Sequence, residues 1–393
     1  MRERQAIVIG AGVAGLAAAW WLRRIGWRVT VLERAADLRD AGYMIGLSGP
    51  GLEVARRMGL MPKLEAAACV INENVYRDTR GRELLRLRYR EFLKDLPYVA
   101  LRRTALVQAL REVLDPSVAV QFSTHVTRVQ GGPNGASVEV ADGRTFEGDL
   151  IIGADGLRSY VRRQLFGPDG SYFKPLGYRF ATYDLADRLN LGADFVSYTQ
   201  PGHIVEYYTL SDHRIAALHV WCSKETGPVA ADQRWPLIER ESARSHPSVM
   251  QMIDLAKAEA AIPVLDDLTL VDMPEWRKGR VLLLGDAAHC LTLISGQGAG
   301  MAIASAGILA EELAKGGIEE ALDRHRARLR PSIRRLQERS IKMGKLFVPA
   351  TPMSFHMRNI MLRYMPRSWL GQYFQNAVKS EIIASQDVAT SAT

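Results

Sequence analysis

The sequence contains little cysteine, with 3 residues in a chain of 393. Cys69, Cys222 and Cys290 are odd in number, lie far apart and form no CxxC pair. This spacing excludes a disulfide framework and a cysteine-based zinc site, and it favours a reducing compartment. We therefore expect a cytoplasmic protein without a bound metal ion.

The sequence also lacks an apolar run long enough to cross a membrane. The N-terminus comes nearest, because Arg2 and Arg4 precede the apolar run 7–22 and imitate a secretion signal. That run contains glycines at a spacing used for nucleotide binding, and cleavage of a signal would remove them. We expect this segment to stay in the protein and the protein to stay in the cytoplasm.

Acidic residues are scarce in one stretch of the chain. Between Arg324 and Arg367 twelve Lys and Arg residues face a single acid, Glu338, while the whole chain carries a formal charge of +8. Helix-turn-helix, zinc-finger and RNP-like aromatic patterns are missing, so we interpret the basic stretch as a solvated face and expect no nucleic-acid partner. The tail 355–374 mixes large apolar residues with arginine and could rest on a membrane or cover an active site. We favour a helix packed on the protein body.

The first half of the sequence alternates short strands with helices, and a chain of this length is expected to form two packed domains. A strand at 6–9, a helix at 13–25 and a strand at 28–32 open the pattern. A helix at 104–114 follows, and further strands are predicted at 118–122, 126–129, 137–140, 145–148 and 150–153. Asn134-Gly135 and Asp142-Gly143 supply hairpin turns between some of these strands.

Longer strands with aromatic residues are predicted from 172 to 274. In the run 214–221 both alternating faces are largely apolar, so we expect a strand that is covered on both sides. A strand at 280–284, a helix at 298–314 and a long basic helix at 319–345, with a kink at Pro331, complete the pattern.

A glycine motif, GAGVAG at 10–15, joins the first predicted strand to the first predicted helix. Gly10 permits a tight turn, Gly12 lets the backbone approach a pyrophosphate, and Gly15 lets the helix pack on the strand. The helix N-terminus then presents unpaired N–H groups to the phosphates. Glu33 closes the second strand, where its carboxylate can accept both hydroxyls of an adenosine ribose. The predicted cofactor-binding residues of this segment are Gly10, Gly12, Ala14, Gly15, Glu33 and Arg34. They indicate a dinucleotide and do not separate FAD from NAD.

Two later motifs make that separation: DLIIGADG at 149–156, and GDAAH at 285–289 running on to GQG at 296–298. Together with the glycine motif, they resemble the FAD-dependent aromatic hydroxylases, the para-hydroxybenzoate hydroxylase-like flavoprotein monooxygenases. The resemblance spans nearly the whole chain. It implies a mixed α/β (α+β) fold, with a discontinuous Rossmann-like FAD-binding domain at 1–171 and 275–330. A sheet-rich substrate-binding domain would occupy 172–274, and a helical region 331–393.

The resemblance implies non-covalent FAD and assigns it further binding residues. Asp286 follows a strand, where its carboxylate can bind the ribitol hydroxyls, and the glycines at 296–298 open a helix whose N-terminus can face the flavin. Arg103 begins an Arg-x-x-Leu-x-x-x-Leu helix that reaches the FAD phosphates in the family, whereas Arg102 is expected to be solvated or at the edge of the core. Asp155 is near both FAD and the visiting nicotinamide in the family, and it can also form a turn. The residues assigned in this way are Arg103, Asp155, Asp286, Gly296, Gly298 and Ala299.

The sequence departs from the family pattern near the flavin. Leu293 replaces a proline beside the flavin C4a atom, Gly300 replaces an asparagine, and Ser305 replaces an aspartate. These departures affect the geometry of oxygen chemistry more than the binding of FAD. His289 and Cys290 are assigned structural roles.

By resemblance, NAD(P)H reduces the flavin transiently, reduced flavin adds dioxygen at C4a, and the hydroperoxide transfers one oxygen to the substrate by hydroxylation or epoxidation. The protein must supply a dry cavity for a hydrophobic aromatic or polycyclic molecule of secondary or catabolic metabolism. Residues suggested to line it are His203, Tyr207, His219 and Trp221. We expect a monomer or homodimer, with no stable membrane contact.

Two other functions stay open at this point. The chain could be an FAD-dependent reductase or dehydrogenase that inserts no oxygen, which Leu293 would suit, or a flavin-binding partner protein without activity. The second is disfavoured because Glu33, Asp155 and Asp286 are all kept. A flavin halogenase is disfavoured because no WxWxIP segment is present.

Overall fold

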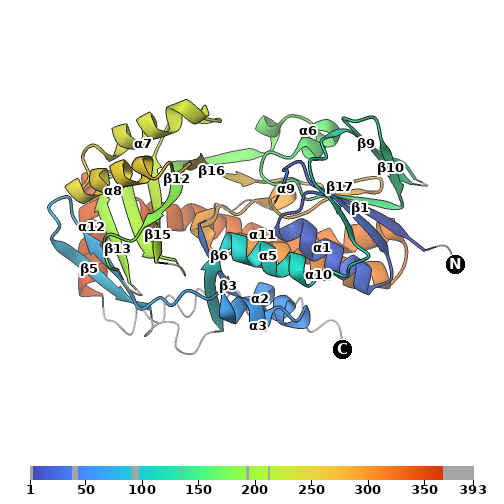
Figure 1. Cartoon of the computed structure of the whole chain (residues 1–393), viewed down its shortest axis with the longest axis horizontal. Helices are drawn as coiled ribbons and strands as arrows, with labels where there is room; N and C mark the ends of the chain where they lie inside the picture. Colours follow the sequence, from blue (N-terminus) through green and yellow to red (C-terminus); the bar gives the residue numbers. More distant parts are fainter. Residues whose placement is uncertain are drawn as a thin grey trace.

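The computed structural model describes residues 3–37, 43–89, 91, 97–133, 135–191, 194–210 and 213–365 of the chain (Figure 1). Asn134 of the first expected hairpin turn and the end of the expected tail, from 366 on, lie outside the described residues. The mixed α/β fold expected from the sequence is confirmed.

The first half of the molecule is built on a six-stranded sheet with the order β17-β18-β11-β1-β2-β7. Its strands are β1 (Gln5–Ile9), β2 (Arg28–Leu32), β7 (Ala119–Gln121), β11 (Leu150–Gly153), β17 (Arg277–Lys278) and β18 (Val281–Leu283). All neighbours from β18 to β7 run parallel, and β17 pairs antiparallel at the edge. Apart from Gln5, the residues of β1, β11 and β18 are apolar or glycine and are buried, as expected for a parallel sheet covered on both faces.

Helices α1 (Val13–Arg24), α5 (Arg103–Glu112) and α10 (Gly298–Ala314) lie together on this half of the molecule (Figure 1). Helix α10 is buried along most of its length because it also contacts α2 (Gly49–Arg57) and α11 (Ile318–Phe347). Helix α11 continues through Pro331. The remaining helices of this half are α3 (Met61–Ala66), α6 (Tyr160–Phe166) and α9 (Asp286–His289).

Two small sheets complete the first half. Strands β8 (Val126–Gly131), β9 (Ala136–Val140) and β10 (Thr145–Gly148) form an antiparallel meander, in which Gly143 has the positive φ of 87° that its turn requires. Strands β3 (Met44–Ser48) and β6 (Tyr98–Arg102) form an antiparallel pair that leads into α2 and α5.

The second half is a seven-stranded sheet with the order β16-β12-β15-β14-β13-β4-β5. Its strands are β4 (Glu73–Arg77), β5 (Glu83–Arg88), β12 (Phe173–Ala186), β13 (Phe195–Gln200), β14 (His203–Thr209), β15 (Arg214–Cys222) and β16 (Val264–Val271). Strands β4 and β5 come from the segment that the sequence assigned to the FAD-binding domain, so the sheet is larger than the range 172–274. The long strands β12 and β16 run from this half toward the other (Figure 1).

Both faces of this sheet are covered, as the alternation in 214–221 predicts. One face packs on α7 (Arg234–Ser242) and α8 (Pro247–Ala258) and includes Ala217 and Trp221 of β15. The opposite face includes Ala216, Leu218 and Val220. Helix α12 (Pro352–Tyr364) contacts the β5 end of the sheet, so this part of the expected tail does form a helix on the protein body. Among the described residues, no helix is both long and apolar enough to cross a bilayer.

Candidate functional site

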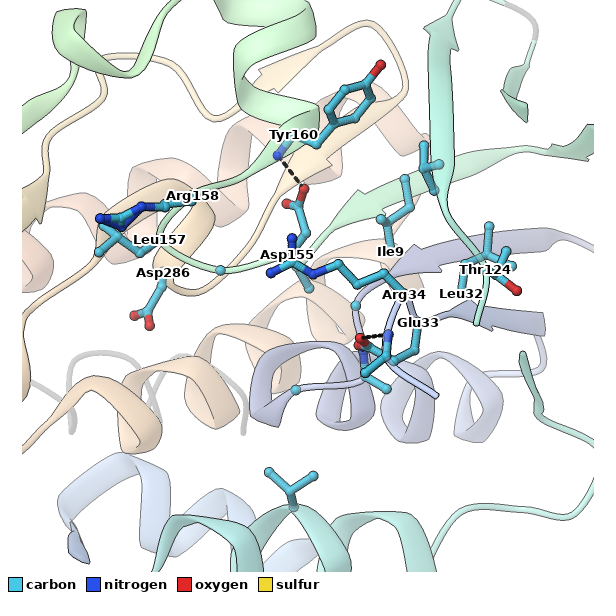
Figure 2. Close-up of a pocket in the computed structure, with 18 of the residues that line it drawn as sticks. Ile9, Leu32, Glu33, Arg34, Thr124, Asp155, Leu157, Arg158, Tyr160 and Asp286 are labelled. Atoms are coloured by element: carbon cyan, nitrogen blue, oxygen red, sulfur yellow. Dashed lines mark hydrogen bonds between the residues drawn. The ribbon is translucent and has the colours of Figure 1, made fainter. Parts of the chain in front are cut away.

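Four parallel strands end side by side at one edge of the six-stranded sheet. The order β18-β11-β1-β2 places Asp286, Asp155, Gly10 and Glu33 along this edge, because each lies just beyond the carboxyl end of its strand. Ligands of open parallel sheets bind at this edge. A groove of about 540 Å³ runs along it, and Figure 2 shows Asp286, Asp155 and Glu33 in this order. Seven of the predicted cofactor residues line the groove: Gly10, Gly12, Glu33, Arg34, Arg103, Asp155 and Asp286.

The three glycines of the first motif have three different surroundings. Gly10 has a φ of +107°, and a Cβ there would lie 2.5 Å from the Ala154 carbonyl oxygen. A Cβ on Gly15 would lie 1.9 Å from the Gly10 carbonyl oxygen, so Gly15 permits the contact of α1 with β1. A Cβ on Gly12 would meet no protein atom within 4 Å, although Gly12 lines the groove. The space at Gly12 is therefore left for a ligand, at the N-terminus of α1, where no side chain caps the free N–H groups.

Glu33 is held rigidly at the end of β2. Its Oε2 atom accepts the backbone N–H of Ala11 at 2.8 Å, and its Oε1 atom accepts that of Ala35 at 2.8 Å. Each carboxylate oxygen can accept a second hydrogen bond, so the two fixed oxygens can receive a pair of ribose hydroxyls. Arg34 is exposed, and its side chain extends across the groove toward Asp155 (Figure 2).

Asp155 both forms a turn and lines the groove. Its Oδ2 atom accepts the backbone N–H groups of Tyr160 at 2.7 Å and Val161 at 3.1 Å, at the start of α6. Its Oδ1 atom accepts the Ser159 hydroxyl at 2.5 Å. The turn role considered from the sequence is therefore confirmed, and the place of Asp155 in the groove is compatible with a role beside the cofactor.

Asp286 and Arg103 occupy the other end of the groove. Burial at this depth raises the pKa of Asp286, and the positive charge of Arg103 opposes that rise. Arg103 is the first residue of α5, and its backbone N–H donates to the Tyr43 carbonyl at 3.1 Å. Arg102 lies on β6 instead, is only 19% exposed at its side chain, and forms an ion pair with Asp184 of β12. From the sequence we expected Arg102 at the edge of the core or in solvent. Its ion pair with Asp184 explains why it lies at the edge of the core.

The flavin loop, defined here as residues 291–298, leads from α9 into α10. Thr292 has a positive φ of 64°, which is uncommon for a β-branched residue, and its carbonyl accepts the Ser295 hydroxyl at 2.9 Å. The buried Gln297 side chain donates to Ser48 Oγ at 3.1 Å, which ties the loop to the end of β3. Ala14, Gly15, Gly296, Gly298 and Ala299 are not part of the groove lining. Ala14 instead packs beside Gly285, where a Cβ would lie 2.7 Å from the Ala14 Cβ.

Two of the three departures from the family pattern, Gly300 and Leu293, have a packing explanation. Helix α2 crosses α10 so closely that a Cβ on Gly51 would lie 2.2 Å from the Gly300 Cα. A side chain longer than one carbon at Gly300 would extend toward this crossing, where Ser48 O and Gly51 Cα already lie within 4 Å of a Cβ. Leu293 packs with the apolar residues of the seven-stranded sheet, so it adds apolar surface to the side of the flavin loop that faces the sheet.

The helix crossing leads to a stability prediction. Gly51→Ala should lower the free energy of unfolding by about 2–3 kcal/mol, because the new Cβ meets backbone that cannot move alone. Gly300→Ala should be neutral or stabilising, because its Cβ would have only ordinary contacts of 3.6 Å and longer. Both changes replace a helical glycine by alanine, so the gain in helix propensity is matched. Urea unfolding of the two variants checks this, and equal effects would contradict the close crossing.

The four residues suggested to line the substrate cavity do not face the flavin loop. Tyr207 and Trp221 belong to the cluster under α7 and α8. His219 is fully buried between Ser242 Oγ at 3.2 Å and the Tyr183 hydroxyl at 3.0 Å, and His203 lies 3.5 Å from Ser245 Oγ. This placement does not fit a substrate-lining role, because the alternation of the strands points these side chains away from the flavin loop.

From the sequence we assigned no role to the opposite side of the sheet, called the flavin-facing face below. It carries Phe180, Phe195, Ile204, Tyr208, Ala216, Leu218 and Val220, in one cluster with Leu293 and Ile294 of the flavin loop. Tyr43 links this face to the groove: its ring lies 6.2 Å from that of Phe180, and its pKa is raised to about 12 by burial, with Arg103 and Asp286 among the charges that act on it. The sequence also missed Thr124 and His125 in the groove, which follow β7 and could have been found by the strand-end rule.

The observed groove fits FAD. Its lining includes the carboxylates of Glu33 and Asp286, one toward each end, and the guanidinium of Arg103. At Gly12, the N-terminus of α1 borders open space in the groove. These are the features that a dinucleotide with a pyrophosphate requires.

Comparisons with known proteins agree with this interpretation. A family model described as "FAD binding domain" matches residues 3–340. An uncharacterised protein of Mycobacterium tuberculosis (strain H37Rv) is 31% identical over 322 residues, which cover 79% of this chain and 85% of that protein. A flavin-dependent monooxygenase of Legionella longbeachae is 28% identical over 347 residues, which cover 87% of this chain and 89% of the relative. The crystal structure of a tetracycline destructase superposes with a TM-score of 0.80 at 25% identity and covers 96% of this chain and 98% of the destructase. The chain therefore belongs to the family defined by this FAD-binding domain, the flavoprotein monooxygenases of the aromatic-hydroxylase type.

Proposed function

We propose that this chain transfers one oxygen atom from dioxygen to a hydrophobic aromatic or polycyclic small molecule, with NAD(P)H as the electron donor. The observation that carries the proposal is the contact between the flavin loop and the flavin-facing face of the sheet. Leu293 and Ile294 pack in one cluster with Phe180, Tyr208 and Leu218. A planar apolar substrate held against this face would lie beside the flavin loop and away from water.

The groove residues would bind and orient the cofactor. Glu33 would hold the ribose of the adenosine, Arg103 the phosphates, and Asp286 the ribitol hydroxyls. Bound FAD supplies the redox chemistry that activates dioxygen. The protein's own contribution to the transfer would be to exclude water: Ile204, Ala216 and Val220 of the flavin-facing face are fully buried and leave no space for it.

Two further observations support the substrate class and the electron donor. The apolar and aromatic character of the flavin-facing face suits a ring system, and the structurally similar destructase is named for tetracycline, which is polycyclic. The sequence has a single GxGxxG motif, so the nicotinamide nucleotide would visit the flavin without a domain of its own. We further propose a cytoplasmic enzyme of secondary or catabolic metabolism, as a monomer or homodimer.

Oxygen transfer is tested with purified, FAD-loaded protein and a panel of phenolic and polycyclic compounds. NAD(P)H oxidation, oxygen uptake and released hydrogen peroxide are followed together, and products are analysed after reaction under labelled dioxygen. We expect at least one compound to accelerate NAD(P)H oxidation, lower the yield of hydrogen peroxide and gain one labelled oxygen atom. The Gly12→Val variant, which should not bind FAD, is the matched control and should show none of these effects.

An anaerobic arm separates the main alternative. If a compound is reduced or dehydrogenated with turnover in the absence of oxygen, and no compound gains labelled oxygen, the chain is an FAD-dependent reductase or dehydrogenase. That outcome would overturn the proposal of oxygen transfer and leave the binding of FAD untouched.

A further inference from the structure

A buried carboxyl group lies on the flavin-facing face of the seven-stranded sheet. Glu206 is in β14 between Ile204 and Tyr208, which both belong to that face, and its residue is only 8% exposed. Ser197 lies opposite it on β13, with Ser197 Oγ 3.0 Å from Glu206 Oε1. The Asn74 side chain of β4 donates to the same oxygen at 3.3 Å. One carboxylate oxygen of Glu206, Oε1, is therefore hydrogen-bonded within the sheet, and the other, Oε2, is left.

The second oxygen, Oε2, has no hydrogen-bond partner among the residues that the structure describes, and within this part of the chain Glu206 forms no ion pair. Arg358 faces the same side of the sheet from α12, but its guanidinium lies 3.4 Å from Thr199 Oγ1 and 3.4 Å from the Phe347 carbonyl. Burying a carboxylate without a cation costs several kcal/mol, on the order of the cost for any isolated ion. An apolar residue would serve the fold better, which points to a ligand as the missing partner.

Aromatic side chains lie near this carboxyl group on the flavin-facing face. Phe195 stacks on Tyr208 with ring centroids 4.9 Å apart, and Tyr89 lies 6.2 Å from Phe195. Tyr76 and Tyr89 are close enough for the charge of Glu206 to act on their hydroxyl groups. A carboxylate with aromatic side chains nearby can bind an organic ammonium group, because an aromatic ring and a negative charge attract the same cation.

We propose that Glu206 binds a protonated amine of the substrate, so that the molecule presented to the flavin is an aromatic or polycyclic amine. This inference rests on the proposed function, because it assigns the substrate class of the same site. Asn74 and Ser197 would act as positioning residues, since they hold one carboxylate oxygen and direct the other away from the sheet. The apolar part of the substrate would cover the neighbouring side chains of the flavin-facing face.

The charge state of Glu206 supplies a signature of this binding. Burial raises the pKa of Glu206 to about 7, and the bonds from Ser197 and Asn74 oppose the rise. Burial also raises the pKa of the hydroxyl groups of Tyr76, Tyr89 and Tyr208, so these groups stay neutral near pH 7. Arg358 stays charged in this range, although burial lowers its pKa. Amine binding should therefore strengthen as the pH rises from about 6 to 8, because ionised Glu206 is the form that binds a cation.

The experiment measures binding to FAD-loaded protein by calorimetry, without NAD(P)H. The probes are three pairs that differ in one group: tryptamine and tryptophol, naphthalenemethylamine and naphthalenemethanol, anthracenemethylamine and anthracenemethanol. We expect at least one amine to bind about tenfold or more tightly than its alcohol at pH 8, a preference that shrinks at pH 6. Glu206→Gln, which keeps the shape and one acceptor, should remove both the preference and its pH dependence.

Tyr207→Phe is the matched control, because Tyr207 is the next residue of the strand and lies on the opposite face. It should keep the amine preference, and the flavin spectrum of each variant reports that FAD remains bound. The proposal is wrong if no amine binds more tightly than its alcohol, or if Glu206→Gln keeps the preference. An amine that binds through Glu206 but never gains oxygen would contradict the proposed function alone.

Discussion

Gly12→Val should abolish the binding of FAD and leave the protein folded. The backbone of Gly12 is extended, with φ −80° and ψ −174°, which valine adopts readily. A Cβ at this position meets no protein atom within 4 Å, so the new side chain would project into the groove instead of the core. There it would occupy the place where the pyrophosphate approaches the N-terminus of α1. We expect FAD affinity to fall at least about 100-fold, equal to about 2.8 kcal/mol.

Gly170→Val is the matched control for this substitution. A Cβ on Gly170 also meets no atom within 4 Å, but Gly170 is not part of the groove. Equilibrium titration with FAD, followed by flavin fluorescence, should give unchanged affinity for Gly170→Val. Circular dichroism and thermal unfolding establish that both variants fold. A Gly12→Val protein that binds FAD normally would show that the cofactor does not approach the chain at the glycine motif.

The groove could be predicted from the sequence because its residues follow strands. Gly10, Glu33, Asp155 and Asp286 were each placed at the end of a predicted strand, and parallel strands must bring such residues to one edge. The helices and strands that the sequence did predict in this half agree with the structure to within about two residues, because their apolar runs are continuous and end at glycine or at charge. The pair β3 and β6 and the helices α2, α3 and α6 were not predicted. The motifs alone do not predict the order of the strands in the sheet, which is seen only in the structure.

The face of the seven-stranded sheet that meets the flavin loop could not be predicted in the same way. Alternation along β14 and β15 separates two faces, and it does not say which face meets α7 and α8 and which meets the flavin loop. Both faces are apolar and both contain aromatic residues, so His219 and Trp221 looked as suitable as Tyr208. The choice depends on contacts between distant segments, such as that of Leu293 with the sheet, and local sequence carries no signal for it.

Acid should destabilise this protein steeply between about pH 6 and 5. His203, His289 and His325 are buried, and burial lowers their pKa values to about 4, about 4 and about 3. The unfolded chain binds protons at these residues below about pH 6.5, whereas the folded protein does not, so unfolding takes up protons. The stability contributed by these neutral histidines is therefore complete at neutral pH and is lost as the pH falls from 6.5 toward 4. His219 acts in the same direction, because burial lowers its pKa as well.

Glu206 opposes this effect, and Asp286, whose pKa burial also raises, acts in the same direction as Glu206. The Glu206 pKa of about 7 means that the folded protein holds a proton that the unfolded chain has released, so this group adds stability as the pH falls from 7 toward 4.5. Three histidines against one carboxyl leave a net uptake of about two protons on unfolding. The free energy of unfolding should then fall by up to about 2.7 kcal/mol per pH unit in this window. Unfolding by urea at pH 7, 6 and 5, at constant ionic strength and with FAD in constant excess, measures the slope.

A single substitution tests whether the buried histidines cause the slope. His203 is 4% exposed, its Nδ1 atom lies 3.5 Å from Ser245 Oγ, and a backbone hydrogen bond to Glu241 only partly opposes the effect of burial on its pKa. His203→Leu removes one of the protons taken up and should reduce the slope by about 1.4 kcal/mol per pH unit, with little loss of stability at pH 7. His356→Leu, at an exposed position of α12, should leave the slope as it is in the unchanged protein. If His203→Leu keeps the full slope, or if stability is flat between pH 7 and 5, the acid sensitivity does not come from these buried rings.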